Sequence, residues 1–172
     1  IPDHSVLSKA RARWGTEVFE ELFIRIVWQC TTAGLVGGTK IHMDGSLVDA
    51  DASKNSVIKG PPELIAEFKK IYQKEEAKLE EKEEPSTKRS YYKPVNKEMF
   101  SKTDPDAPVV RHGKGGSRPR YKNHRVVDDN HGVITAVETT PGDVEENAKL
   151  LDLVDQHERN TEIKVDTVVA DR

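Results

Sequence analysis

Residues 121–139, YKNHRVVDDNHGVITAVET, carry the strongest fold signal in the chain. Two β-prone runs flank DDNHG, whose Asp, Asn and Gly residues favour a tight turn, so the stretch predicts a β-hairpin. Downstream, Asp143 and Glu146 form a capping-box-like start for a helix that is expected to run to about His157. Residues 163–170, IKVDTVVA, are rich in β-branched residues and predict a strand buried on both faces. The buried stripe of the helix is expected to comprise Val144, Ala148, Leu151 and Val154.

A further strand is expected upstream, at residues 40–48, KIHMDGSLV. Its alternation places Ile41 and Met43 on one face, and His42 and Asp44 on the other. A strand, a hairpin, a helix and a second strand, in this order, predict an α/β protein with a mixed (α+β) sheet. In that sheet, three antiparallel strands are extended by a parallel one.

Four segments are expected along the chain. These are an N-terminal helical segment at 1–38, the first strand and its loop at 39–59, an insertion at 60–119, and the hairpin, helix and last strand at 120–172. The insertion reads as a charged, solvated helix at 63–84, followed by an irregular basic arm at 85–119 that is rich in Pro, Gly, Lys and Ser.

The N-terminal segment predicts two helices, at 3–14 and 16–32, because Gly15 interrupts the pattern. The second helix has apolar residues at helical spacing, so one face of it is expected to be buried. That face comprises Phe19, Leu22, Phe23, Ile26, Val27 and Cys30.

The composition restricts the class of protein. The 172 residues hold 27 Lys and Arg against 30 Asp and Glu, a net charge of −3, and one cysteine. A single cysteine excludes an intramolecular disulfide framework and a Cys-based zinc site, and fits a reducing compartment. No apolar run approaches the roughly 20 residues that a membrane span needs. Because the chain starts without Met and stops directly after an apolar run, we expect it to be a piece of a longer protein.

The stretch from residue 107 to residue 127, which begins within the irregular arm, is strongly basic. It holds six Lys and Arg residues and two His residues but no acid. Such a stretch indicates contact with phosphates, since each neutralised phosphate releases condensed counterions. The alternative is an exposed loop that its charge keeps soluble. The glycine run in the arm lacks the spacing of a phosphate-binding P-loop.

Two acids stand out by position. Asp44 lies on the first strand and Asp171 at the end of the last one, so parallel neighbouring strands would bring both carboxylates to one edge of the sheet. Two carboxylates in such a position repel each other, and a hard divalent cation relieves the repulsion. The alternative is that both acids cap turns.

Four blocks of the chain resemble the DDE transposases of bacterial insertion sequences, which have a ribonuclease H-like catalytic core. Together they span nearly the whole chain in order. The blocks are IPDHS and RARWG within residues 1–15, GLV and IHMDGSLVDADAS within 34–53, TDPDA at 103–107, and the hairpin sequence of 121–143 with VVAD at 168–171.

The resemblance implies that Asp44 and Asp171 are the first two acids of an Asp-Asp-Glu triad that binds Mg²⁺ or Mn²⁺. Two ions about 3.5–4 Å apart would bracket the scissile phosphate. The third acid has no counterpart before the chain ends, so we expect these residues alone to be inactive in strand transfer. Candidate DNA contacts are Lys122, His124 and Arg125, with Arg120 and Lys54.

The implied partners are transposon-end DNA and target DNA, with a homodimer as the intact assembly, in the bacterial cytoplasm at the nucleoid and without a membrane. Three alternatives stay open: a truncated transposase relic that binds DNA without catalysis, a ribonuclease H-like nuclease or resolvase that cuts but never joins strands, and a charged domain with neither role.

Overall fold

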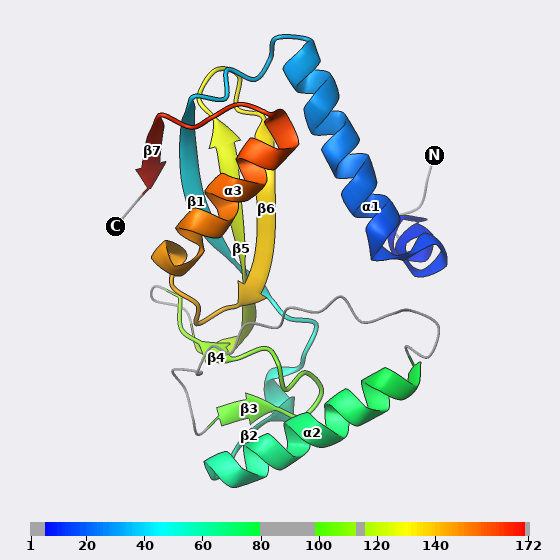
Figure 1. The fold of residues 1–172 in the computed structure, drawn as a ribbon. Helices are drawn as coiled ribbons and strands as arrows, with labels where there is room; N and C mark the ends of the chain where they lie inside the picture. The colour runs from blue at the N-terminus through cyan, green and yellow to red at the C-terminus, as the bar shows by residue number, and fades with distance from the viewer. Residues whose placement is uncertain (1–5, 80–98, 113–115, 171–172) are drawn as a thin grey trace. The chain divides into compact units, whose positions relative to one another are not determined.

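The computed structural model describes residues 6–79, 99–112 and 116–170 (Figure 1). The chain divides into two compact units. Unit 1 comprises Ile1–Asp44, Arg125–Val137 and Lys149–Arg172, and unit 2 comprises Gly45–His124 and Glu138–Ala148. Each unit is described by itself below.

The main sheet has five strands: β1 (Lys40–Asp49), β4 (Val109–Val110), β5 (Arg118–Asp128), β6 (Ile134–Pro141) and β7 (Thr167–Ala170). Their order is β4-β5-β1-β7, and β6 pairs with β5. β1 and β7 are parallel, whereas β4 and β5 are antiparallel. The sheet is therefore mixed, as the sequence predicts, and the α/β fold is consistent with a ribonuclease H-like core.

The predicted hairpin is confirmed, with a turn that follows Asp128 at the end of β5. The amide of Gly132 donates to the carbonyl of Asp128, and Gly132 has a φ of 71°. A residue with a side chain rarely adopts that backbone conformation, so glycine suits this position.

The core of unit 1 lies between the sheet and helix α3 (Leu150–Thr161). Alternation along β1 points Ile41 and Met43 into this core, where both are almost fully buried. Three more buried side chains complete the cluster: Val126, Ala136 and Leu153.

The sequence placed the start of α3 too early. Residues Glu146–Lys149 form a short 3-10 helix instead, because the amides of Val144 and Ala148 donate to carbonyls three residues earlier, in local turns. The predicted buried stripe is also wrong in part. Leu151 is 74% exposed, while Leu153 is fully buried.

Helix α1 (Val6–Thr32) bends at Gly15, whose φ of 79° and ψ of 173° lie outside the helical region. The two predicted helices are therefore confirmed. The buried face expected for the second helix is confirmed in part: Val27 is buried, and Phe19, Phe23 and Cys30 are partly buried. Leu22 and Ile26 are 52% and 49% exposed, because the contact of α1 with α3 does not cover the whole predicted face.

Unit 2 contains a second, two-stranded sheet. β2 (Val57–Lys59) pairs antiparallel with β3 (Met99–Ser101), and helix α2 (Pro62–Leu79) packs on it through Phe68, whose ring centroid lies 5.6 Å from that of Phe100. Proline as the first helical residue suits α2, because that position needs no amide donor. The charged helix predicted at 63–84 is therefore present as α2, over the part of that range that the structure describes.

The irregular arm expected at 85–119 is corrected in the residues that the structure describes. β3, β4 and the beginning of β5 fall within it, because short β pairings satisfy its backbone amides. Residues 85–98 and 113–115 of the arm lie outside the described residues. No described helix has the length and apolar character that crossing a membrane would require.

Candidate active site

Asp44 lies on β1, on the face opposite the core residues Ile41 and Met43. Its side chain is 66% exposed, and Oδ2 lies 3.5 Å from Nη2 of Arg125 on β5. An exposed carboxylate at this point of the sheet has hard oxygen donors of the kind that Mg²⁺ and Mn²⁺ prefer.

The parallel register of β1 and β7 is described from Lys40–Thr167 to Met43–Ala170. Asp44 and Asp171 are the next residues of the two segments in the sequence. Asp171 lies outside the described residues, so the convergence of the two carboxylates stays a prediction. Within the described ranges, no group of three or more His, Cys, Asp or Glu side chains is arranged to hold a metal ion.

The segment that leads into β1 is fastened by a buried acid. Asp128, at the end of β5, is 1% exposed. Its Oδ1 accepts the amide of Gly38 at 2.7 Å, and its Oδ2 accepts the amides of Gly37 at 3.1 Å and Asn130 at 3.0 Å. Sequence reasoning treated Asp128 only as a turn residue. The sequence signal for this contact was the Gly37-Gly38 pair before β1, because a carboxylate can approach the amides of glycines closely.

A second ion cluster lies on the same face of β1 as Asp44. Nε2 of His42 lies 2.6 Å and Nζ of Lys40 lies 3.1 Å from Oδ1 of Asp129. The hydrogen bond from His42, and then that from Lys40, lowers the pKa of the Asp129 carboxyl below its ordinary value. Lys40 and His42 thus share one partner, the carboxylate of Asp129.

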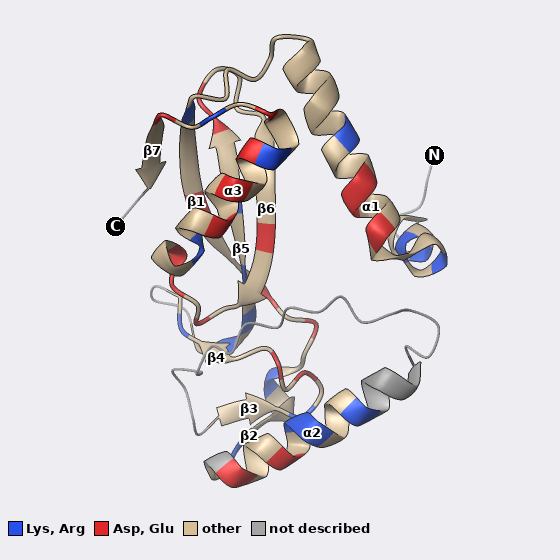
Figure 2. Ribbon diagram, viewed as in Figure 1, with Lys and Arg blue, Asp and Glu red and all other residues tan. Residues whose placement is uncertain are grey.

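Most of the expected DNA contacts lie on β5, along which Figure 2 marks Lys and Arg in blue, but their side chains occupy different environments. Lys122 is 16% exposed, and its Nζ lies 3.8 Å from a carboxylate oxygen of Glu146. The same oxygen, Oε1, would lie 2.6 Å from a Cβ atom at Gly45. Glu146 therefore occupies the space beside the backbone of Gly45 within unit 2, and this close approach explains the glycine that follows Asp44.

Arg120 serves the structure of unit 2. Its side chain is 10% exposed, and it donates from Nε to Asp49 at 2.6 Å and from Nη1 to the carbonyl of Val110 at 3.1 Å. Arg118 donates to the other oxygen of Asp49 at 2.8 Å. These bonds, that of Arg120 first, lower the pKa of Asp49. The position of Arg120 does not support the expected DNA contact.

His124 is fully buried, with Nε2 2.8 Å from Oγ1 of Thr140 on β6. A phosphate could reach the imidazole only if the two strands separated, so its position does not support a direct DNA contact either. Lys54, in contrast, is exposed in the short 3-10 helix Lys54–Ser56. Ser53 caps this turn by accepting the amide of Asn55 at 3.1 Å.

The TDPDA block of residues 103–107 forms a hydrogen-bonded corner of unit 2. Oγ of the buried Ser101 accepts the amides of Thr103 and Asp104, both at 3.2 Å. Tyr121 on β5 donates to Asp104 at 2.8 Å. Burial, and then this bond to a carboxylate, raises the pKa of the Tyr121 hydroxyl, which therefore stays protonated. Sequence reasoning found the block but not its role, which is to fix the arm against β5.

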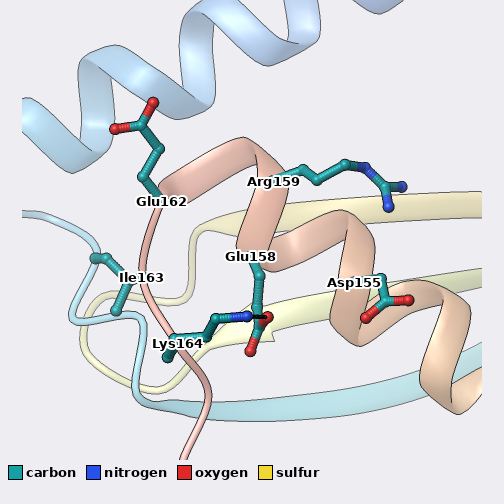
Figure 3. Close-up of a pocket in the computed structure, with 6 residues that line it drawn as sticks. All are labelled: Asp155, Glu158, Arg159, Glu162, Ile163 and Lys164. Atoms are coloured by element: carbon teal, nitrogen blue, oxygen red, sulfur yellow. Dashed lines mark hydrogen bonds and ion pairs between the residues drawn. The ribbon is translucent and has the colours of Figure 1, made fainter.

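A shallow pocket lies at the end of α3 in unit 1 (Figure 3). Glu158 forms an ion pair with Lys164 and accepts the amide of Val165 at 3.1 Å. The bond from Lys164 is the main cause that lowers the pKa of Glu158. No residue that the sequence singled out for chemistry lines this pocket. Its lining residues are Asp155, Glu158, Arg159, Glu162, Ile163 and Lys164.

Among the described residues, the mixed sheet thus presents the exposed carboxylate of Asp44 beside the guanidinium of Arg125. Residues 100–172 match the family model described as the transposase DDE domain. The match confirms the resemblance to DDE transposases for the sequence blocks that lie within residues 100–172. It covers β3 to β7 and Asp171, but not β1 with Asp44. No curated protein and no solved structure gives a significant match to the chain.

Proposed function

We propose that the chain forms part of the catalytic core of a DNA transposase, which cleaves phosphodiester bonds at insertion-sequence ends and transfers the resulting strands. Asp44 and Asp171 are the carboxylates that hold the metal. The parallel pairing of β1 with β7 carries the proposal, because these acids directly follow the last described register pair, Met43–Ala170. The transposase family match at residues 100–172 gives independent support.

The Asp44 side chain fits a divalent cation, because its carboxylate is exposed and already attracts a positive charge. The guanidinium of Arg125 lies 3.5 Å from its Oδ2. Mg²⁺ or Mn²⁺, when bound, would neutralise charge on the phosphate that reacts. Asp44 and Asp171 would hold the ion, and Arg125, Lys122 and Lys54 would contact backbone phosphates of the DNA.

We further propose transposon-end DNA and target DNA as partners, a homodimer as the working assembly, and the bacterial nucleoid as the location. Helix α2 and the arm that follows it would contact end DNA or the second subunit. The Lys and Arg residues along β5, blue in Figure 2, support the DNA partner, because cations that neutralise phosphates supply a large share of the affinity of DNA-binding proteins.

The metal site is tested by titration with Mn²⁺, followed by the loss of the free-ion signal in electron paramagnetic resonance. We expect Asp44→Asn to weaken Mn²⁺ binding at least tenfold, since it removes a charged ligand. Asp51→Asn is the matched control, because Asp51 is an exposed acid in the loop after β1 and is expected to bind normally. Equal affinity of the wild type and Asp44→Asn would refute the assignment.

The reaction is tested with a DNA substrate labelled at its 3′ end, which distinguishes joining from hydrolysis. We expect residues 1–172 alone to give negligible strand transfer, because the third acid of the triad has no counterpart among them. Efficient strand transfer by these residues would contradict that expectation. Metal-dependent cutting without joining would favour a nuclease, and salt-dependent binding without cutting would favour a DNA-binding relic.

A further inference from the structure

Asp44 and Arg125 lie on neighbouring strands of unit 1, with 3.5 Å between Oδ2 and Nη2. Both side chains are open to solvent, with 66% and 36% of their surfaces exposed. The distance is longer than the 2.6–2.8 Å of the Asp49 ion pairs with Arg118 and Arg120. The guanidinium is therefore close enough to attract the carboxylate but is not locked to it.

The other basic side chains on this face of β1, Lys40 and His42, bond a different acid, Asp129. Nζ of Lys40 and Nε2 of His42 lie 3.1 Å and 2.6 Å from Oδ1 of Asp129, so both side chains bond that acid. Among the described contacts, the cation that lies beside Asp44 is Arg125. Charges along this face are thus divided between two clusters, one around Asp129 and one at Asp44.

We propose that Arg125 is a competing counter-ion of Asp44. A divalent cation binds Asp44 only as the guanidinium withdraws, and a phosphate group that draws Arg125 away strengthens metal binding at Asp44. The inference rests on the proposed function, because it takes Asp44 to be a metal-holding carboxylate. Arg125 acts here as a positioning residue, through its effect on that carboxylate.

Electrostatics gives the direction of the competition. A guanidinium beside the carboxylate occupies part of its lone-pair surface and also repels an incoming cation. An ion pair as exposed as this one changes the affinity by about fivefold at most. Because binding linkage is reciprocal, a metal ion that displaces Arg125 must strengthen phosphate binding by the same factor with which phosphate strengthens metal binding.

The test measures Mn²⁺ affinity by electron paramagnetic resonance at low ionic strength, without DNA. We expect Arg125→Gln to bind Mn²⁺ about three- to fivefold more tightly than the wild type, while Arg125→Lys stays near the wild type because it keeps the charge. Arg159→Gln, an equal charge change at an exposed position of α3, is the matched control and is expected to change the affinity less than about 1.5-fold. Arg125→Met keeps the apolar stem and serves if the Gln variant does not fold.

A second titration adds a duplex of 20 base pairs as the phosphate source. We expect the duplex to strengthen Mn²⁺ binding by a larger factor in the wild type than in Arg125→Gln. Unchanged or weaker Mn²⁺ binding by Arg125→Gln, an equal gain in Arg159→Gln, or the same duplex factor in both proteins would overturn the inference. Asp44→Asn separates the two proposals. If it binds Mn²⁺ like the wild type, the proposed site fails, whereas its loss of binding together with an unchanged Arg125→Gln overturns the competition alone.

Discussion

Replacement of Asp128 by Asn tests how the strand that carries Asp44 is held in place. The carboxylate of Asp128 is buried and accepts three backbone amides, two on Oδ2 and one on Oδ1. An Asn side chain has one acceptor oxygen. In its better orientation it keeps the two bonds of Oδ2, and it turns an NH₂ group toward the amide of Gly38, where two donors then face each other.

The loss is therefore one hydrogen bond to a charged group and one unsatisfied buried donor, which together cost about 2–3 kcal/mol of unfolding free energy. Asp128→Ala loses all three bonds and is expected to cost about 4 kcal/mol or more. The assay is equilibrium unfolding in urea, followed by circular dichroism, with the slope of the transition compared between variants.

Asp129→Asn is the matched control for Asp128→Asn, because it changes the next residue in the same turn. Asp129 is 44% exposed and bonded to His42 and Lys40, so solvent screens these contacts and we expect a clearly smaller loss of stability than for Asp128→Asn. If Asp128→Asn lay within about 0.5 kcal/mol of the wild type, or matched Asp129→Asn, the three amide bonds would not hold the loop as argued.

Three other changes have distinct expected outcomes. Leu153→Ala empties a fully buried position in the core of unit 1 and is expected to lower the unfolding free energy by about 3–5 kcal/mol in a urea titration. Gly142→Ala places a Cβ atom 2.6 Å from a backbone carbonyl oxygen of β5, whereas a Cβ atom at Gly116 meets no atom within 4 Å, so only the former is expected to lower the melting temperature. Glu158→Gln removes the negative charge and one of the two oxygens that accept from Lys164 and from the amide of Val165, the bonds that lower the Glu158 pKa from its ordinary 4.5. A lowered pKa stabilises the fold above the ordinary value, so Glu158→Gln should melt below the wild type at pH 7, and the gap should close as the pH falls below about 4; a constant gap would refute the sign.

The positions of the strands and the hairpin could be predicted because their signals are local. The last strand is corrected, however: β7 spans only Thr167–Ala170 at one end of the strand order, and Val169 is 41% exposed rather than buried. Alternation along residues 40–48 placed Ile41 and Met43 in the core, and the turn residues after Asp128 fixed the hairpin. Gly15 marked the break in α1 for the same reason, since a φ of 79° favours glycine. The mixed sheet followed from the order of these elements.

Burial could not be predicted as well, because it depends on distant parts of the chain. Leu22 and Ile26 fit a buried face by spacing but are half exposed, since spacing does not say how much of a helix another element covers. The reverse holds for His124 and Arg120. Both belong to a basic sequence stretch and look like surface residues, yet partners on other strands, Thr140 for His124 and Asp49 for Arg120, hold them inside.

The strength of the ion pairs separates the acids that serve the fold from the one proposed to serve chemistry. Asp128 accepts three backbone amides, Asp49 bonds Arg120 at 2.6 Å, and Asp129 bonds His42 at 2.6 Å. A metal ion that bound one of these carboxylates would first have to break short bonds that position a loop or a strand. The carboxylate of Asp44 is the most exposed of the four and meets its guanidinium only at 3.5 Å, so replacing that partner by a metal ion costs the fold little. Since a catalytic carboxylate has to exchange its partner in order to bind metal, its loose pairing is what the proposed role requires, and the spacing of acids in the sequence does not reveal it.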